Sequence, residues 1–85
     1  MTLDLRYARS FLKDLISLEP AVYERVYDYV FVKFRDFDNL YDLPELHSLE
    51  ASRIFYRFTL ENYFIGIEVT GQIVKFVRIL PKPEL

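Results

Sequence analysis

Three consecutive segments in the C-terminal part of the chain constrain its fold most, because they alternate apolar and polar residues and are separated by short turn signals. Alternation with a period of two is typical of strands with one buried face. We expect strands at residues 52–59, 63–70 and 72–80. Gly71 allows the positive φ of a tight turn, and Pro81 stops the last strand near Leu80 because it donates no backbone hydrogen bond. Strands joined this closely predict an antiparallel meander.

The first part of the chain has a different period and predicts two helices. Residues 2–7 alternate like a short strand, whereas from Ala8 onward the apolar residues recur at helical spacing. Pro20 fits the first turn of a second helix, which we expect to end at Phe34 or Phe37. The order β-α-α-β-β-β predicts an α+β fold with two N-terminal helices packed on one face of a small antiparallel sheet. The 85 residues are expected to form a single domain, 1–85.

The composition supports a packed core and excludes several kinds of chemistry. Hydrophobic residues make up 52% of the chain and include 8 Phe and 7 Tyr, which supply enough apolar surface for a small core. Cysteine is absent and His47 is the single histidine, so a disulfide framework, a thiolate nucleophile and a multi-histidine metal site are excluded. No apolar run is long enough to cross a membrane or act as a secretory signal, so we expect a cytoplasmic protein with no membrane partner. The net charge of −2 gives no overall attraction to nucleic acid but leaves room for a local basic face.

The predicted second helix carries two apolar stripes, which is more than one buried face requires. The first stripe is Val22, Val26, Val30 and Phe34. The second, adjacent stripe is Tyr23, Tyr27 and Phe31. Either the helix lies in a deep groove between the sheet and the other helix, or the Tyr23–Tyr27–Phe31 stripe contacts a partner chain.

Basic residues gather in and just after the predicted meander. They are Arg53, Arg57, Lys75, Arg78 and Lys82. On the last strand, alternation assigns to one side Val74, Phe76, Arg78 and Leu80. A sheet face carrying Arg57, Glu68 and Arg78 could grip a phosphate through the arginine forks. The alternative is a solvated outer face whose arginines pair with Glu68 and Glu61.

The long connection, residues 35–51, is acidic and carries His47 in a loop just before the meander. His47 could act as a general acid or base if partners lie within hydrogen-bond reach, and Glu45 and Glu50 could act as bases. The alternative is an exposed or structural histidine. The sequence contains no glycine-rich phosphate loop, nucleophile elbow or metal-ligand spacing, so the candidate chemistry rests on these residues and on the basic face.

The meander resembles the core of the RelE/ParE toxin superfamily. The resemblance lies in residues 56–69, YRFTLENYFIGIEV, where the superfamily has Tyr-Arg-Ile-Arg, a short turn, Tyr-Arg-Ile, an apolar run and Glu-Val. Gly71 and the strand after it also fit, as does the helix opening at residues 7–15, YARSFLKDL. The resemblance covers nearly the whole chain and implies the same β-α-α-β-β-β fold.

Membership would imply a toxin of a bacterial toxin–antitoxin module, with an antitoxin protein as partner. The RelE branch cleaves mRNA in the ribosomal A site without a metal or other cofactor, through basic residues that stabilise the charge developing on the phosphate. The ParE branch acts on DNA gyrase instead. Carried over to this chain, the resemblance assigns charge stabilisation to Arg57, Arg78 and Lys82, and proton transfer to His47 or a nearby glutamate. RNA contacts are expected from Arg53 and Lys75.

Several positions depart from the superfamily pattern where the chemistry lies. Thr59 stands where a second basic residue is usual, Phe64 stands where the pattern places a catalytic arginine, and Pro81 replaces a frequent histidine. Active ribosome-dependent members are strongly basic, whereas this chain is acidic. We therefore expect a RelE/ParE-like toxin whose mRNA cleavage is weak or altered. The alternatives are a degenerate member that acts by binding a protein, including a second copy of itself, and a gyrase-directed toxin.

Overall fold

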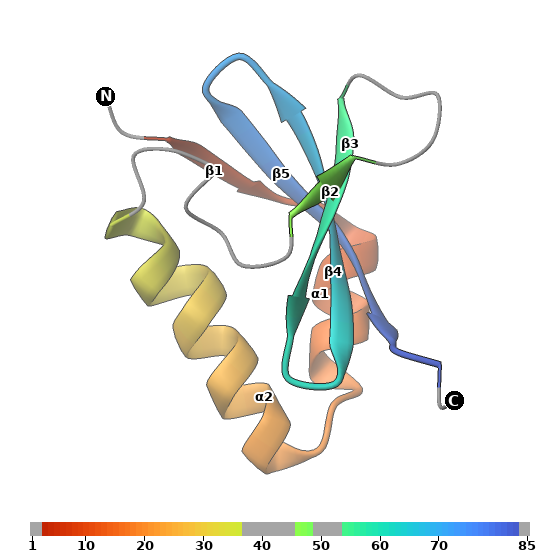
Figure 1. Ribbon diagram of the computed structural model, residues 1–85. Coiled ribbons are helices and arrows are strands. Elements are labelled where there is room, and N and C mark those ends of the chain that lie inside the picture. The colour runs from red at the N-terminus through yellow and green to blue at the C-terminus, as the bar shows by residue number, and fades with distance from the viewer. Residues whose placement is uncertain (1–2, 37–45, 49–53, 84–85) are drawn as a thin grey trace.

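The computed structural model describes residues 3–36, 46–48 and 54–83. The elements follow in the predicted order, with one additional short strand before the meander (Figure 1). They are β1 (Asp4–Tyr7), α1 (Arg9–Ile16), α2 (Pro20–Tyr27), β2 (His47–Ser48), β3 (Phe55–Leu60), β4 (Tyr63–Thr70) and β5 (Ile73–Pro81). Beyond α2 the helical path continues through a π-helical turn, Asp28–Val32, and a 3-10 turn, Lys33–Asp36. The predicted α+β class with two N-terminal helices is confirmed, and the alternative helix end at Phe37 lies outside the described residues.

The strands form one five-stranded sheet in the order β1-β5-β4-β3-β2. The predicted meander is present, because β3, β4 and β5 pair antiparallel to one another. The sheet as a whole is mixed, since β1 runs parallel to β5. A parallel pair needs a long crossover connection, and here the two helices and the rest of the chain between β1 and β5 supply it.

Both helices cover the same face of the sheet, and the core lies between them and the strands (Figure 1). The stripe predicted for the core supplies Val26, Val30 and Phe34, all fully buried, while α1 adds Phe11 and Leu15. From the sheet the same core receives Phe58, Ile65, Ile67, Val74, Phe76 and Ile79. Within the described ranges no polar or charged residue is buried. The apolar spacing read from the sequence therefore identified the core face of the second helix correctly.

A β-bulge in β5 overturns one prediction about the sheet faces. Gly66 of β4 pairs with Arg78, but the next residue, Ile67, pairs with Phe76, so Val77 is an extra residue in β5. An extra residue reverses the alternation of the strand that carries it. Val74 and Phe76 are therefore buried, whereas Arg78 and Leu80 are exposed on the opposite face of the sheet. The prediction that these four residues share one side was wrong.

The connection before the meander contains a short strand that the sequence did not predict. His47 pairs with Arg57 and Ser48 pairs with Tyr56, so His47 lies in β2 at the edge of the sheet, not in a loop. Two residues are too few to show alternation, and their assignment to a strand depends on their pairing with β3, which local periodicity does not show. Glu45, Glu50 and Arg53 lie outside the described residues.

Candidate functional site

The face of the sheet turned away from the helices carries the predicted basic residues in register. Three rows cross β3, β4 and β5, and each row consists of residues that pair directly. The rows are Thr59–Phe64–Leu80, Arg57–Gly66–Arg78 and Phe55–Glu68–Lys75. We call this surface the outer face. It brings together Arg57, Arg78 and Lys75 as side chains of one surface, because residues paired directly across a sheet point to the same side.

Arg57 and Lys82 converge on Phe64 from the two sides of β4. The guanidinium carbon of Arg57 lies 4.2 Å from the centre of the Phe64 ring, and Nζ of Lys82 lies 5.7 Å from it. These distances are typical of cation–π contacts, which hold a cation over an aromatic face. Gly66, opposite Arg57, has no side chain, so nothing projects from β4 between Arg57 and Arg78. We refer to Arg57, Phe64 and Lys82 as the aromatic–cation cluster.

Glu61 and Glu68, the two acids considered as partners for the arginines of this face, form no ion pair with Arg57 or Lys82. Glu61 forms an ion pair with Arg25 of α2, with Nε and Oε1 2.9 Å apart. Glu68 lies in the row of Phe55 and Lys75. Neither Arg57 nor Lys82 forms an ion pair with another residue of the described part of the chain. The positive charges of the cluster are therefore not neutralised by those residues.

Arg78 differs from Arg57 because it forms an ion pair with Asp14 of α1. Its Nε donates to Oδ2 of Asp14 at 2.7 Å, and the same oxygen accepts the Ile79 N–H at 2.9 Å. β1 ends at Tyr7, and beyond that point α1 satisfies the free edge of β5, since Ser10 Oγ also donates to the Val77 carbonyl at 2.6 Å. Burial by itself would raise the pKa of Asp14, but the hydrogen bonds from Arg78 and the Ile79 N–H outweigh it and lower that pKa below its ordinary value.

One row of the sheet contains most of the residues predicted to be catalytic. It runs from His47 in β2 through Arg57 and Gly66 to Arg78 in β5. The backbone of His47 thus lies directly opposite that of Arg57 in the neighbouring strand. Lys82 follows β5 and reaches the neighbouring row through Phe64. The sequence analysis noted Phe64 only because it replaces a catalytic arginine of the superfamily pattern. Its contact with Arg57 was not predicted, because it depends on the register between β3 and β4.

The Tyr23–Tyr27–Phe31 stripe forms a stacked series of rings beside the buried stripe. The ring centres of Tyr23 and Tyr27 are 5.8 Å apart, and those of Tyr27 and Phe31 are 4.6 Å apart. Phe31 stacks in turn on Tyr7 of β1 at 4.3 Å, and the Tyr7 hydroxyl donates to the Val30 carbonyl at 3.2 Å. Burial raises the pKa of Tyr7. The stripe is therefore anchored to the core at Phe31, whereas Tyr27 remains 43% exposed.

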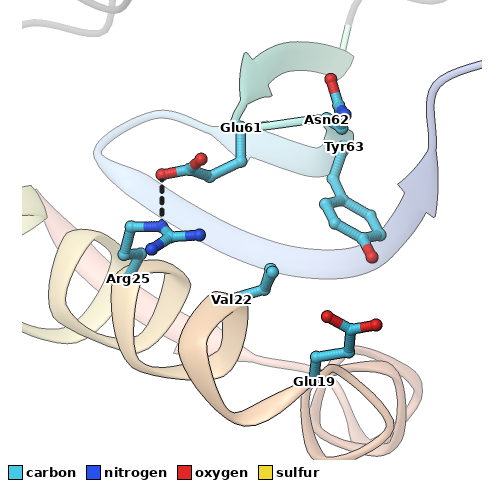
Figure 2. Close-up of a pocket in the computed structure, with 6 residues that line it drawn as sticks. All are labelled: Glu19, Val22, Arg25, Glu61, Asn62 and Tyr63. Carbon is cyan, nitrogen blue, oxygen red and sulfur yellow. Dashed lines mark ion pairs between the residues drawn. The ribbon is translucent and has the colours of Figure 1, made fainter.

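A polar cleft of about 490 Å³ lies between the start of α2 and the β3–β4 turn (Figure 2). Its walls are Glu19, Val22 and Arg25 from the helix side and Glu61, Asn62 and Tyr63 from the turn. Figure 2 shows the Arg25–Glu61 ion pair on one side of the cleft and Glu19 with Tyr63 on the other. The sequence identified the turn but not the cleft, because the helix and the turn meet only in the folded chain.

The described residues contain no group of three or more acidic, histidine or cysteine side chains that could hold a metal ion. None of the helices in the described part of the chain is long and apolar enough to span a membrane.

Comparison with known proteins places this architecture among RelE-like folds. No family model matches the chain. Toxin RelE3 of Methanocaldococcus jannaschii is 28% identical over 80 residues, which cover 93% of this chain and 90% of that protein. The RelB-RelE antitoxin-toxin complex from Methanococcus jannaschii contains a chain with a TM-score of 0.75 and 28% identity, covering 89% of this chain and 88% of that one.

More distant structures have the same fold. The toxin–antitoxin complex RelBE2 from Mycobacterium tuberculosis contains a chain with a TM-score of 0.77 at 14% identity, covering 96% of this chain and 100% of that one. The archaeal RelE-RelB complex from Pyrococcus horikoshii gives a TM-score of 0.73 at 20% identity, with 100% of both chains covered. The fold is thus the RelE-like α+β class. The sequence relative, at 28% identity, is a RelE toxin, in line with the resemblance to the RelE/ParE superfamily that the sequence analysis described.

Proposed function

We propose that this chain is the toxin of a toxin–antitoxin module and that it acts on translation as a weak, metal-independent mRNA endoribonuclease. The observation that supports the proposal most directly is the position of Arg57. This arginine lies on the outer face over Phe64, has no ion pair with another described residue, and stands in one row with His47 and Arg78. The relatives named above, a toxin and toxin chains bound to antitoxins, support the toxin role.

The chemistry follows from the charge that develops on a phosphate during cleavage. In the proposed mechanism the Arg57 guanidinium and the Lys82 ammonium stabilise that charge, which is electrostatic catalysis by preorganised cations. His47 would transfer the proton, because its backbone lies opposite Arg57. Lys75, in the next row, would contact the RNA backbone, as would Arg53, which lies outside the described residues.

The same geometry gives a reason for weak activity. The charge of Arg78 is compensated by Asp14, so this arginine must exchange its partner before it can bind a phosphate fully. Thr59 and Phe64 occupy outer-face positions and carry no charge. Arg57 and Lys82 therefore carry most of the proposed stabilisation.

The Tyr23–Tyr27–Phe31 stripe is the surface that we propose for the antitoxin. Its rings are stacked into a continuous apolar strip, with Tyr27 more than two-fifths exposed. Such strips are typical of sites that another chain covers. The stripe runs along α2 and the π-helical turn that follows it, on the helix-covered side of the sheet, so an antitoxin bound there would have to reach around the molecule to cover the outer face (Figure 1).

The same stripe favours a second candidate, a degenerate member that acts only by binding protein. Induction of the chain in a bacterial culture separates the possibilities. Rapid loss of labelled amino-acid incorporation supports the nuclease proposal. Arrest with protein synthesis intact points to gyrase, and normal growth with folded protein present supports the binding-only candidate.

Arg57→Ala provides the sharpest test of the proposed chemistry. We expect this variant to reduce mRNA cleavage and the loss of protein synthesis by roughly 100-fold or more, the size of effect seen when a preorganised charge-stabilising group is removed. The measurement is the initial rate of mRNA cleavage on purified ribosomes, with circular dichroism to check folding. Lys33→Ala is the matched control, because Lys33 is an exposed cation of the helical segment, paired with Asp28 at 3.6 Å. Full cleavage by folded Arg57→Ala would show that the electrostatic assignment is wrong.

A further inference from the structure

Phe64 is a large aromatic residue that the core does not use. It belongs neither to the buried cluster nor to the partly buried residues that pack against that cluster. Its ring lies on the outer face between Thr59 and Leu80, its direct partners in the sheet. Leu80 is 46% exposed, so this part of the surface is apolar and accessible. An aromatic residue on an open sheet face makes little contribution to the core, and a function in binding is the natural explanation.

The Arg57 side chain covers one side of this apolar surface. Its guanidinium carbon is 4.2 Å from the ring centre, which leaves no room for another group between the cation and the ring. A planar guanidinium over an aromatic ring keeps its N–H groups directed outward and exposes a second planar surface. Gly66, directly opposite Arg57, contributes no side chain of its own, and a Cβ added there would meet atoms of Arg78 at ordinary contact distance, 3.9 Å.

Planar groups of this kind bind unpaired nucleobases. Bases of single-stranded RNA stack on aromatic rings and on arginine guanidinium planes, whereas the bases of a duplex are stacked on one another. The cluster also provides a charge for the adjoining backbone, because Lys82 approaches the same ring from the other side of β4. A protein with a net charge of −2 gains little long-range attraction for RNA, so stacking would supply affinity that its charge does not.

We propose that the aromatic–cation cluster is a stacking site for one unpaired nucleobase of single-stranded RNA. Arg57 lies between the Phe64 ring and the base, and Lys82 binds the phosphate next to it. This inference rests on the proposed function and deepens it, because it assigns to Phe64 the positioning of the RNA strand beside the row of Arg57. Phe64 is a binding and positioning residue in this scheme and takes no part in proton transfer.

The test compares an oligomer with bases and one without. The full chain is titrated with single-stranded hexa-adenylate RNA and with an abasic phosphate oligomer of the same length, and binding is followed by NMR through the backbone and arginine side-chain signals. The chain is expected to bind hexa-adenylate about tenfold more tightly than the abasic oligomer, in line with the stacking of one base. Phe64→Leu should lose this preference while its affinity for the abasic oligomer stays unchanged, and Phe64→Tyr should keep the preference.

Phe55→Leu is the matched control, since Phe55 is an exposed phenylalanine of the same face, in the row of Glu68. Its preference for hexa-adenylate should equal that of the unaltered chain. Three results would overturn the proposal: no base preference in the unaltered chain, an unchanged preference in Phe64→Leu, or an equal loss of affinity for both oligomers in Phe64→Leu. The last would mean that Phe64 only orients Arg57 toward phosphate.

The culture experiment separates this inference from the proposed function. If induction stops protein synthesis but Phe64→Leu keeps the base preference, the stacking site is wrong and the toxin proposal stands. If Phe64→Leu loses the base preference but the unaltered chain leaves protein synthesis intact, the stacking site stands and the action on translation is wrong.

Discussion

The two faces of the sheet are formed by the same strands, but one is buried in the core and the other is accessible. In one row across β3, β4 and β5, Phe58, Ile65 and Ile79 point toward the helices and all are almost completely buried. In the next row, Thr59, Phe64 and Leu80 point away from the helices and remain partly or largely accessible. A shift of one position along the strand thus separates a residue of the core from a residue of the candidate site.

The two faces differ in whether they carry charged side chains. Among the described residues, the inner face contains no fully buried polar or charged side chain, because burying a charge without a partner is costly. None of the described helices covers the outer face, where Arg57 and Lys82 lie over Phe64 (Figure 1). Stability and candidate function should therefore respond to different substitutions, and three further predictions test this separation.

The largest expected effect on stability lies on the inner face, at Phe76. Its ring contacts those of Tyr7, Phe11 and Phe34, with ring centres 5.0 to 5.4 Å apart. Phe76→Ala should lower the free energy of unfolding by about 3–5 kcal/mol, because it removes a fully buried ring and leaves a cavity. Phe55→Ala on the outer face should lower it by much less. Urea denaturation measures both, and equal losses would contradict the division between the faces.

An intermediate effect is expected at Asp14, which links α1 to the edge of β5. Asp14→Asn should lower the free energy of unfolding by about 1 kcal/mol at neutral pH, because a charged acceptor for Arg78 and the Ile79 N–H is lost. The pKa of Asp14 is lower in the folded chain than its ordinary value, so its contribution is complete above that ordinary value and disappears as the pH falls through the folded-state pKa. The stability difference between the two proteins should therefore be constant above about pH 5 and shrink toward pH 3.

Urea denaturation of both proteins at a series of pH values measures this difference. The difference between the free energies of unfolding of the two proteins at each pH does not include the contribution of Asp4, because both proteins contain it. The pKa of Asp4 is lowered by its hydrogen bond from Arg6. A difference that stays the same down to pH 3, or grows there, would mean that the Asp14 carboxylate is not stabilised by these donors.

The smallest effect is expected at Gly66, and its sign should be opposite to that at Gly71, because the two glycines have different backbone conformations. At Gly66 an added Cβ would meet Arg78 atoms at ordinary contact distance, 3.9 Å, so Gly66→Ala should raise the free energy of unfolding by about 0.5 kcal/mol. Gly71 has a φ of 61° in the β4–β5 turn, so Gly71→Ala should instead lower it, by about 1 kcal/mol. Thermal or urea denaturation can resolve the opposite signs. A marked loss of stability in Gly66→Ala would indicate that the outer face is packed more tightly than its contacts suggest.

The sequence allowed most of the fold to be predicted, because the signals involved are local. The bounds of β4 agree with the prediction, the turn at Gly71 has the positive φ that was expected, and the stripe of Val26, Val30 and Phe34 is the buried one. The β1–β5 pairing was not predicted, since a strand of four residues carries no information about which strand it will join. The predicted roles of Arg57, Arg78, Lys82, His47, Arg53 and Lys75 stay predictions.

The sequence by itself determined the periodicities: where helices and strands occur, which residues are apolar and which side of each regular element can be buried. These properties follow from neighbours along the chain. Only the tertiary structure decided how the candidate site is assembled. The bulge at Val77 places Arg78 on the outer face, Asp14 forms an ion pair with it, and Arg57 of β3 lies over Phe64 of the adjacent strand β4. The register between strands depends on backbone hydrogen bonds between residues far apart in the sequence, and local alternation carries no record of them.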